Sequence, residues 1–336
     1  GLEQYRHMKK FKFVLFLAIF WTIIPAQVFG QEYVTVTASC GDGIYSLIRK
    51  SGPEPTPSIV AKFKALNEGI LKGRDVLQIG RSYRVPSTAK VYPIFGKAYQ
   101  NVSTTSERLK GHVYYIIAGH GGPDPGTIGK FEGLQLPEDE IAYDTSLRLA
   151  RNLIQESATV YVIVRDDNDG IRDVEQFDID TDEYYLGGGK IVRSQSQRLR
   201  DRTEIVNRLY RENKSWAKSQ QMMSLHVDAY GGNFEPQIDV HFKAASKGGY
   251  ALSRVLRDTM AAKYAEFQPN RVYKGGIDDS ANYYVLNNSR PVAVLVELGN
   301  IRHSGDQYRL VKPGNRQAIA DWLRDGLISA AGGKSL

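Results

Sequence analysis

The sequence almost lacks cysteine. Cys40 is the only one in a chain of 336 residues. A disulfide or a zinc–thiolate cluster needs more than one cysteine, so the chain can form neither on its own. Hydrophobic residues make up 42% of the sequence, which is enough for one or two domains with a sizeable core. The stability of the fold must therefore come from packing.

A second feature that is missing is a nucleic-acid-binding pattern. The formal net charge is +7, but no run of Lys and Arg with interleaved aromatic residues occurs. The mild basic excess suits an anionic surface or polymer instead. We therefore expect no nucleic-acid partner.

An apolar run lies near the N-terminus, but it is too short for a comfortable membrane span. Three lysines between positions 9 and 12 precede the apolar stretch Val14–Ile24. Val28 and Gly30 place small residues before a cleavage site at Gln31. We interpret residues 1–30 as upstream residues and a signal peptide, and an uncleaved anchor is the alternative. The protein is then exported to the periplasm, the cell envelope or the medium, with no stable membrane span after signal removal. No cysteine sits at the cut itself, which argues against a lipoprotein anchor.

Residues 31–87 are expected to form a small βααβ unit. The strand Tyr33–Thr37 runs into a Gly41-Asp42 turn, two amphipathic helices follow, and a strand ends at Pro86. This stretch resembles a LysM module, and the matching residues are Tyr33, Val34, Gly41, Asp42, Ile44, Tyr45, Leu47, Ile48, Leu66, Asn67, Leu77, Ile79, Gly80, Tyr83, Val85 and Pro86. The resemblance implies binding of N-acetylglucosamine-containing glycans such as peptidoglycan. A small packing domain without a sugar site is the alternative.

The remainder of the chain reads as a linker and a larger domain. Residues 88–110 lack long periodicity and contain Pro93, Gly96 and a Ser/Thr cluster, so we interpret them as a linker. In residues 111–336, apolar runs typical of buried strands alternate with helical patterns. Beyond the strand His112–Gly119, the expected elements are helices over 139–156, 198–212, 249–264 and 315–331 and strands over 159–165, 221–229 and 292–299. This alternation predicts an α/β fold with a mainly parallel central sheet flanked by helices.

Residues 166–190 interrupt the alternation and are rich in acidic side chains. Asp178, Asp180 and Asp182 alternate, which suggests a calcium site. However, Glu183 stands where an EF-hand loop requires glycine. We therefore favour a solvated acidic surface insertion.

Three side chains suited to catalysis come late in expected strands. His120 lies between Gly119 and Gly121 after an apolar run, and His226 and Glu297 lie within apolar runs. Such groups are costly to bury unless they are paired or bound to metal. Sheets of this class place ligand sites beyond the carboxyl ends of their strands. These residues are therefore candidates for one site.

A fourth candidate, Glu138, lies at the start of an expected helix. Two histidines and a glutamate can supply three ligands to Zn²⁺ and leave the fourth position to water. A further carboxylate can then act as general base. From the residues alone, other interpretations stay open: Glu138 as a favourable helix N-terminal charge, His226 as a core histidine and Glu297 as a member of a buried ion pair.

Residues 112–334 resemble the zinc-dependent N-acetylmuramoyl-L-alanine amidases of the Amidase_3 type. The motifs that carry the resemblance are AGHGGPDPG at 118–126, EDEIAYDTSLRL at 138–149, LRDRTEIVN at 199–207, SLHVDA at 224–229 and PVAVLVELGNIRH at 291–303. The resemblance implies that His120, Glu138 and His226 bind zinc and that Glu297 is catalytic. It also implies cleavage of peptidoglycan at the bond between N-acetylmuramic acid and L-alanine of the stem peptide.

The sequence departs from the family pattern in places that concern the substrate. Ile117, Asp228, Asn300 and His303 stand where other residues are common, and the acidic insertion has no counterpart in the minimal domain. We expect His303 to be a solvated loop residue and His112 and His241 to be structural. The alternatives to an amidase are another zinc peptidase, such as a carboxypeptidase acting on stem peptides, or a non-catalytic wall-binding protein. A regulatory activator protein stays open.

Overall fold

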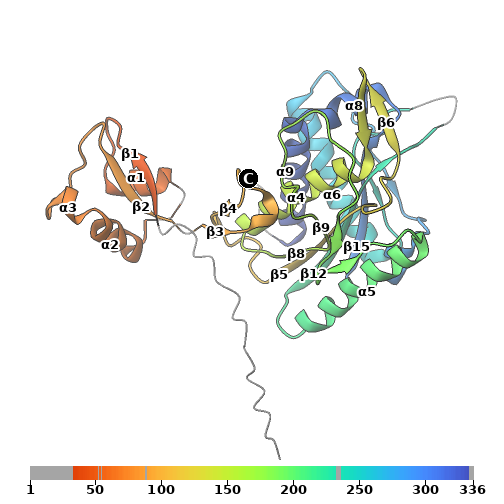
Figure 1. The fold of residues 1–336 in the computed structure, drawn as a ribbon, viewed down its shortest axis with the longest axis horizontal. Helices are drawn as coiled ribbons and strands as arrows, with labels where there is room; N and C mark the ends of the chain where they lie inside the picture. Colours follow the sequence, from red (N-terminus) through yellow and green to blue (C-terminus); the bar gives the residue numbers. More distant parts are fainter. Residues whose placement is uncertain (1–32, 52, 54, 88, 232–235, 333–336) are drawn as a thin grey trace, which may run out of the picture.

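An N-terminal unit and a larger α/β unit make up the described part of the chain (Figure 1). The computed structural model describes residues 33–51, 53, 55–87, 89–231 and 236–332. The predicted signal segment lies outside these residues. No helix within the described ranges is long and apolar enough to cross a membrane.

The N-terminal unit has the expected βααβ order, with one short helix added. Strand β1 (Tyr33–Thr37) pairs antiparallel with β2 (Ser82–Pro86). Between them lie the helices α1 (Ile44–Lys50), α2 (Pro57–Leu66) and α3 (Glu68–Leu71). The unit has its own hydrophobic core, in which Leu47, Ile48 and Phe63 are fully buried.

A buried amide connects the helices of this unit to its sheet. The side chain of Asn67 donates to the carbonyl oxygens of Phe63 at 2.8 Å and Arg84 at 2.7 Å. Its carbonyl oxygen accepts from the backbone N–H of Arg84 at 2.8 Å. Because buried polar groups need such partners, these bonds hold the end of α2 against strand β2.

The α/β unit is built on a six-stranded sheet with the order β14-β13-β15-β12-β5-β8. The pairs β8–β5, β5–β12, β12–β15 and β13–β14 are parallel, and β13 runs antiparallel to β15. The strands are β5 (His112–Ala118), β8 (Thr159–Val162), β12 (Ser219–Asp228), β13 (His241–Lys243), β14 (Ile277–Asp278) and β15 (Val292–Asn300). The prediction of a mainly parallel sheet flanked by helices is confirmed.

Successive side chains of a strand point to opposite faces, and each face of the sheet has its own hydrophobic core. Tyr114 and Ile116 of β5 lie in the core to which α6, α8 and α9 contribute, whereas Val113, Tyr115 and Ile117 lie in the core to which α5 and α7 contribute. Helix α4 contributes side chains to both cores. Figure 1 shows α9 and α5 on opposite sides of the strands. The helices are α4 (Glu138–Gln155), α5 (Gln195–Asn213), α6 (Lys247–Phe267), α7 (Tyr284–Asn288), α8 (Ser304–Val311) and α9 (Pro313–Ala330).

A β-hairpin that was not predicted leads into α4. Strands β6 (Ile128–Phe131) and β7 (Leu134–Pro137) pair antiparallel, and Glu132 and Gly133 between them have φ of 50° and 83°. Two consecutive residues with positive φ are typical of a tight hairpin turn. The hairpin ends directly before Glu138 and so places the first turn of α4.

The prediction of a linker over 88–110 was wrong for most of its length. It contains β3 (Lys90–Val91), the 3₁₀ helix η1 (Pro93–Phe95) and β4 (Asn101–Val102). Phe95 and Val102 are buried in the same core as Tyr115, where their segment contacts α4, and Leu109 is buried in the other core. These apolar side chains attach the segment to the α/β unit, because burial of such groups stabilises packing.

The single strand expected over 159–165 is divided between two sheets. Strand β8 belongs to the central sheet, whereas β9 (Val164–Arg165) joins β10 (Tyr184–Tyr185) and β11 (Gly189–Lys190) in a small antiparallel sheet. The backbone of Ile163 marks the division: its N–H bonds to Ile116 of β5, and its carbonyl accepts from Leu186.

The insertion over 166–190, which we expected to be a solvated acidic loop, is exposed over much of its length but is anchored by several buried side chains. Ile171, Phe177 and Glu183 are buried, with exposed fractions of 7%, 3% and 7%. The guanidinium of Arg172 lies 4.6 Å from the centre of the Phe177 ring, within the range of a cation–π contact. Apolar residues spaced among the acidic ones therefore pack this insertion into the domain, next to the start of α4.

Candidate active site

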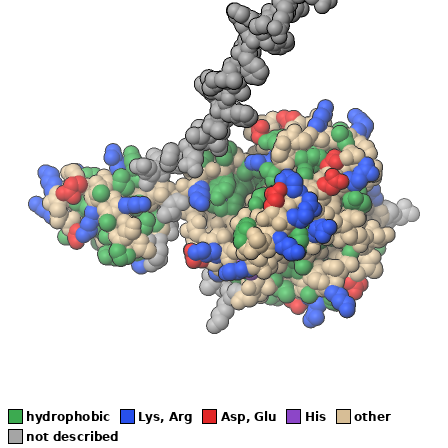
Figure 2. Space-filling view, turned by 90° about the horizontal axis from the view of Figure 1, so that it is seen from below, with side chains coloured by type: hydrophobic (Ala, Val, Ile, Leu, Met, Phe, Trp, Pro, Cys, Tyr) green, Lys and Arg blue, Asp and Glu red, His purple; other side chains and the backbone are tan. Residues whose placement is uncertain are grey.

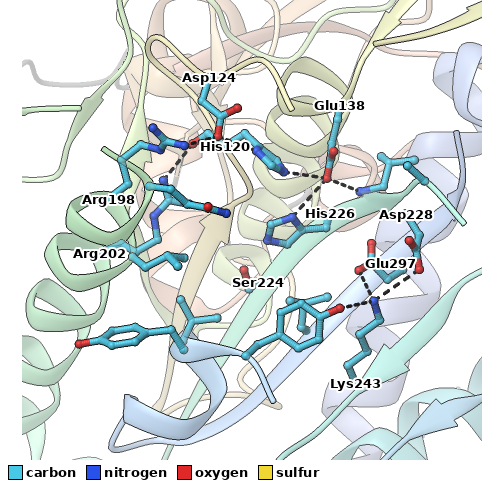
Figure 3. A pocket seen from close by; sticks show the side chains of 18 residues that line it. His120, Asp124, Glu138, Arg198, Arg202, Ser224, His226, Asp228, Lys243 and Glu297 are labelled. Atoms are coloured by element: carbon cyan, nitrogen blue, oxygen red, sulfur yellow. Dashed lines mark hydrogen bonds and ion pairs between the residues drawn. The ribbon is translucent and has the colours of Figure 1, made fainter. Parts of the chain in front are cut away.

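The predicted site residues meet at the carboxyl ends of three adjacent strands. His120 follows β5, His226 lies in β12 and Glu297 lies in β15, opposite His226 in the strand register. Glu138 is the first residue of α4. Figure 3 shows these four side chains around one pocket. Residues 177 positions apart in sequence, from His120 to Glu297, are thus brought to one edge of the sheet, as expected for this fold class.

Two imidazoles and one carboxylate converge in this pocket. Nε2 of His120 lies 3.1 Å from Oε1 of Glu138, and Nδ1 of His226 lies 3.2 Å from the same oxygen. One donor atom from each of the three residues falls within 4.8 Å of the others. A set of two histidines and one glutamate is one of the donor sets that hold catalytic zinc.

The Glu138 carboxylate is fixed by the backbone. Oε2 accepts from the N–H of Thr127 at 3.0 Å, and Oε1 accepts from the N–H of Val227 at 3.2 Å. Burial alone would favour the neutral acid, but hydrogen bonds from His120 and His226 outweigh it and hold the pKa of Glu138 well below its usual range. The group therefore enters the site as an oriented anion.

His120 is held in an unusual backbone conformation. Its φ of 61° lies in the left-handed region, which is uncommon for residues other than glycine and often marks a functional site. Its Nδ1 lies 2.8 Å from Oδ2 of Asp124, which leaves Nε2 to face Glu138. Burial lowers the pKa of His120, but Asp124 and Glu138 more than compensate and raise it to about 9. The surroundings of this ring thus favour a positive charge.

The glycines around His120 are required by the neighbouring side chains. A Cβ on Gly119 would lie 2.4 Å from Nδ1 of His226, and a Cβ on Gly126 would lie 2.7 Å from Oε2 of Glu138. A Cβ on Gly122 would lie 2.8 Å from the Cβ of Ile191, which follows the insertion. The motif therefore lets the three donor side chains approach one another, and it lets the segment at Ile191 pack against the loop.

Glu297 lies beside the donor set and is 5% exposed. Nζ of Lys243 donates to its Oε1 at 2.9 Å, and its Oε2 has no hydrogen-bond partner in the described structure. Burial raises the pKa of Glu297, and this effect outweighs the opposite effects of His226 and Lys243. One oxygen of this carboxylate is therefore free to accept a proton or a hydrogen bond.

Lys243 was missed from the sequence. It ends β13, and its ammonium group also donates to the hydroxyl of Tyr283 at 2.9 Å and lies 3.4 Å from Oδ2 of Asp228. Burial would lower its pKa, but the Glu297 carboxylate dominates and raises it, so the side chain stays charged. The surrounding residues at 240–243 alternate between apolar and polar side chains, so no signal in the sequence singled out Lys243.

The guanidinium groups of α5 form another wall that was not predicted as functional. Arg198 donates to Oδ2 of Asp124, and Arg202 donates to the carbonyl oxygen of His120 at 3.0 Å. Both arginines line the pocket. Arg202 thus supports the backbone at His120, and Arg198 supports the Asp124 carboxylate that orients the His120 ring. Helix α5 therefore contributes to the position of this donor without itself supplying one.

The remaining histidines that were considered lie outside this pocket. His112 bonds to the Ser219 hydroxyl at 2.8 Å, and His241 accepts from the N–H of Gly276 at 3.2 Å, as expected of structural residues. His303 is not a solvated loop residue. Its Nδ1 accepts from the backbone N–H groups of Gly305 and Asp306 and caps the N-terminus of α8.

Comparison with known families agrees with this arrangement. The model of the Amidase_3 family, described as N-acetylmuramoyl-L-alanine amidase, matches residues 115–329. The chain belongs to this family. The matched range contains the central sheet, apart from the first three residues of β5. It also contains the three donor residues His120, Glu138 and His226 and the neighbouring Glu297. The prediction of a peptidoglycan amidase is thereby confirmed, whereas the metal and the role of each residue stay predictions.

The individual proteins to which this chain is similar share low sequence identity with it. A germination-specific N-acetylmuramoyl-L-alanine amidase of Bacillus subtilis is 20% identical over 223 residues, which are 66% of this chain and 80% of that protein. An uncharacterized cell wall amidase of Bacillus anthracis is 23% identical over 66% of this chain and 35% of its own length. Among solved structures, the catalytic domain of an amidase from Paenibacillus polymyxa has a TM-score of 0.48 at 18% identity, covering 66% of this chain and 99% of that one. An amidase of Nostoc punctiforme has a TM-score of 0.46 at 21% identity, covering 67% and 98%.

Proposed function

We propose that this amidase is a zinc enzyme in which His120, Glu138 and His226 hold the metal and Glu297 is the general base. The bond that it cleaves joins the lactyl group of N-acetylmuramic acid to L-alanine of the stem peptide. The observation that carries the proposal is the convergence of the three donors beside a buried glutamate with one unpartnered oxygen. This is the donor set and general base that zinc-assisted hydrolysis requires.

The surroundings of the three donors fit a cation. The pKa of Glu138 is held low, so its carboxylate is available as an anionic ligand. Asp124 orients the His120 ring from behind, in the manner of the outer partners that tune metal-bound histidines. Gly119 and Gly126 leave the space that the donors occupy. When bound, zinc would polarise the scissile carbonyl and lower the pKa of a water molecule.

Glu297 has the position and surroundings of the proton carrier. Its free Oε2 accepts the proton of the attacking water, and the same oxygen then delivers this proton to the leaving amine nitrogen of L-alanine. Hydrolysis is thereby balanced: water adds its oxygen to the lactyl carbon and its protons to the new carboxyl and amine products. Lys243 holds Oε1 and so orients the carboxylate toward the pocket.

The N-terminal unit is proposed to bind the glycan of the same polymer. Its surface carries three apolar side chains that are far more exposed than its core, namely Tyr45 at 58%, Val76 at 75% and Ile79 at 70%. Such exposed apolar side chains are available for contact with the faces of sugar rings. Attachment to the wall would raise the local concentration of substrate without a change in the chemistry. Export of the chain through its signal segment is part of the same proposal.

The first test removes the proposed base. Glu297→Gln should retain about one zinc per chain by elemental analysis and lose roughly 10²–10⁴-fold in kcat in a muropeptide amidase assay. Glu212→Gln, on the exposed side of α5, is the matched control and should behave as wild type. Near-normal turnover of Glu297→Gln would show that another group accepts the proton.

The second test removes a proposed ligand. His120→Ala should lose both zinc and activity, whereas His112→Ala, at the other end of the same strand, should keep both. Stoichiometric zinc in His120→Ala would contradict the ligand assignment. Mass spectrometry of the products separates an amidase from a carboxypeptidase, because only the amidase releases an intact stem peptide from the glycan.

The glycan-binding proposal is tested on the full chain. Ile79→Ser should reduce sedimentation with insoluble peptidoglycan and leave hydrolysis of soluble muropeptides unchanged. Val272→Ser, which changes a 72% exposed apolar residue of the α/β unit, is the control. Equal sedimentation of both variants and wild type would remove the support for a binding surface at Ile79.

A further inference from the structure

A second group of acidic side chains lies beside the donor set, where the insertion meets α4. The insertion brings Asp169, Asp180 and Glu183 to Asp139 and Glu140 in the first turn of the helix. The side chains fall into three overlapping triads whose oxygens could hold a metal: Asp139–Glu140–Glu183, Glu140–Asp169–Asp180 and Asp166–Asp180–Asp182. Glu140 and Asp180 are each shared by two triads. We call these seven residues the carboxylate cluster.

The inner part of this cluster is deeply buried and incompletely bonded. Asp139 and Glu140 are each 2% exposed, and Glu183 is 7% exposed. Oδ2 of Asp139 and Oε1 of Glu140 are buried oxygens with no hydrogen-bond partner in the described structure. Asp139 and Glu140 both belong to the inner triad, in which one oxygen of each residue lies within 4.8 Å of the others. A buried acceptor without a partner lowers the stability of the fold. A bound cation would supply the missing partner for these two oxygens.

The protein offers little positive charge to this cluster. Within the described residues, its ion pairs involve Arg172 alone, which contacts Oε2 of Glu140 at 2.7 Å and also Asp169. The remaining contacts are neutral hydrogen bonds, such as the backbone N–H of Gly122 to Oε2 of Glu183 at 2.7 Å and Asn168 to Asp182 at 3.0 Å. Arg172 therefore pairs with two of the seven acids, and the buried Asp139 and Glu183 have no ion pair among the described residues. The favourable end of the α4 dipole offsets only a fraction of one charge.

We propose that the carboxylate cluster binds a hard divalent cation, calcium, centred on the inner residues Asp139, Glu140 and Glu183 or on the adjoining triad that shares Glu140. The donors are oxygens only, which excludes the nitrogen-rich surroundings that zinc prefers. Calcium accepts six to eight oxygen ligands in flexible geometry, and carboxylates in two side-by-side triads can supply them. Magnesium requires stricter geometry and retains several waters, which a buried cluster does not favour.

The position of this cluster indicates what the cation would do. Asp139 and Glu140 directly follow Glu138, and Glu183 holds the N–H of Gly122, two residues after His120. A cation here would therefore connect the insertion to both chain segments that carry the donor set. The site differs from the EF-hand arrangement considered from the sequence, because its ligands come from α4 and from separate parts of the insertion and do not include Asp178.

The test is calcium binding by the full chain, measured without reference to activity. Chelator-treated protein, with and without one equivalent of zinc, is titrated with calcium by isothermal calorimetry and by thermal unfolding. Binding with Kd of roughly 10⁻⁵–10⁻³ M and a rise in Tm are expected in both preparations, and magnesium should bind more weakly. Because the preparation without zinc is included, this outcome is independent of the zinc proposal.

Variants decide whether the cluster is responsible. Asp139→Asn/Glu140→Gln, and separately Asp180→Asn in the less buried part of the cluster, should weaken calcium binding by roughly tenfold or more. Asp258→Asn/Glu266→Gln on the exposed face of α6 is the matched control and should bind as wild type. Folding is checked by circular dichroism, and Asp180→Asn provides a second reading if the buried double variant unfolds.

Two outcomes would overturn the proposal. If the folded wild-type chain shows no binding heat and no change in Tm at about 10 mM calcium, the buried carboxyl groups are neutralised by protons instead. If both cluster variants bind calcium as tightly as the control, the cation lies elsewhere.

Discussion

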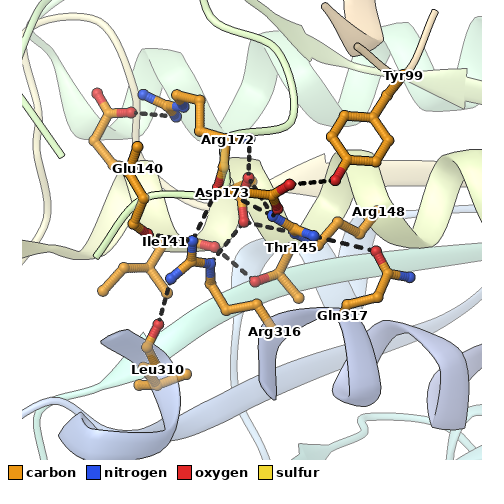
Figure 4. A network of polar contacts seen from close by, with 12 residues as sticks. Tyr99, Glu140, Ile141, Thr145, Arg148, Arg172, Asp173, Leu310, Arg316 and Gln317 are labelled. Atoms are coloured by element: carbon orange, nitrogen blue, oxygen red, sulfur yellow. Dashed lines mark hydrogen bonds and ion pairs between the residues drawn. The ribbon is translucent and has the colours of Figure 1, made fainter. Parts of the chain in front are cut away.

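Two groups of buried acids lie on the same helix, α4, and their partners differ. Asp144 is fully buried and accepts from Nε of Arg148 at 2.8 Å, Nε of Arg316 at 2.7 Å and the backbone N–H of Arg172 at 2.8 Å. Arg316 in turn donates to the carbonyl oxygens of Leu310 and Val311. Figure 4 shows this network of guanidinium groups between α4 and α9.

At the start of α4 the buried acids have fewer cationic partners than Asp144 has. Asp139 and Glu140 each keep one buried oxygen without a partner. Burial, together with the neighbouring Glu183, raises the pKa of Asp139 to about 7. Burial and the charge of Asp139 raise the pKa of Glu140 to about 8, although Arg172 opposes this. Figure 4 shows Glu140 reached by Arg172 at the edge of the same network.

The difference separates two uses of buried charge. An arginine stays charged at any physiological pH, so Asp144 is neutralised by a permanent part of the chain. Asp139 and Glu140 have no such full compensation, so their negative charge is either removed by protons or balanced by a bound cation. The first pattern holds α4 to α9, and the second is suited to binding.

The largest expected effect breaks the permanent pairing. Arg316→Met leaves Asp144 as a buried carboxylate with one guanidinium partner fewer and should lower the free energy of unfolding by about 3–5 kcal/mol in urea denaturation. Arg208→Met, which breaks an exposed pair with Glu212, should cost only about 0.2–1 kcal/mol. The double variant Asp144→Asn/Arg316→Met should recover part of the loss, and equal losses in single and double variants would argue against charge as the cause.

The next effect concerns the outer partner of His120. Asp124→Asn removes the anion that orients Nδ1 of this ring and should weaken zinc binding by roughly 10–100-fold in competition with a chromophoric chelator. Asp201→Asn on α5 is the control, because it lies outside the pocket lining. Unchanged affinity of Asp124→Asn would show that Glu138 and the backbone alone orient the ring.

Much of the fold could be predicted because strong periodic patterns mark its long elements. The strands carrying His226 and Glu297 and the helices α4, α5, α6 and α9 were all expected near their observed bounds. The short elements were missed, because two or three residues such as His241–Lys243 give no periodic signal. The linker and the insertion were misjudged for a related reason: polar composition hid isolated anchors such as Phe95 and Phe177.

The residues of the candidate site also differ in how far the sequence alone could reveal them. His120, His226 and Glu297 stood out because each interrupts an apolar run at a strand end, which sequence alone reveals. Glu138 was selected by the resemblance to a family, since a glutamate at a helix start has an ordinary explanation. Lys243 and the carboxylate cluster depend on contacts between distant segments, such as Glu183 with Gly122. Tertiary contacts of this kind leave no local pattern.

A smaller effect tests the uncompensated acids. Glu140→Gln should raise the free energy of unfolding of the metal-free chain by roughly 1 kcal/mol at pH 9, where the wild-type carboxylate is ionised and buried. The pKa of Glu140 rises from 4.5 to about 8 in the folded protein, so the folded state binds the extra proton between these values. Wild-type stability therefore falls as pH rises through this window, and the variant should show a smaller fall.

The control for this prediction is Glu266→Gln, an exposed residue of α6 whose pH dependence of unfolding should match wild type. Addition of calcium should make wild type more stable than Glu140→Gln, because only wild type keeps the full carboxylate cluster. A Glu140→Gln variant that is less stable than wild type at pH 9 without metal would mean that the contact with Arg172 outweighs the cost of the buried charge.

The smallest expected effect comes from removing Lys243, the permanent cation beside Glu297 in the active site. Lys243 lowers the pKa of Glu297 while burial raises it, so Lys243→Met should raise that pKa further. The base acts only when ionised, and the acidic limb of the kcat/KM profile should therefore move to higher pH. Tyr283→Phe, which keeps the ion pair and removes one donor–acceptor contact of Lys243, should shift the limb less. Zinc content measured at each pH separates this effect from loss of metal, and an unshifted limb at full zinc occupancy would mean that the group titrating there is not Glu297.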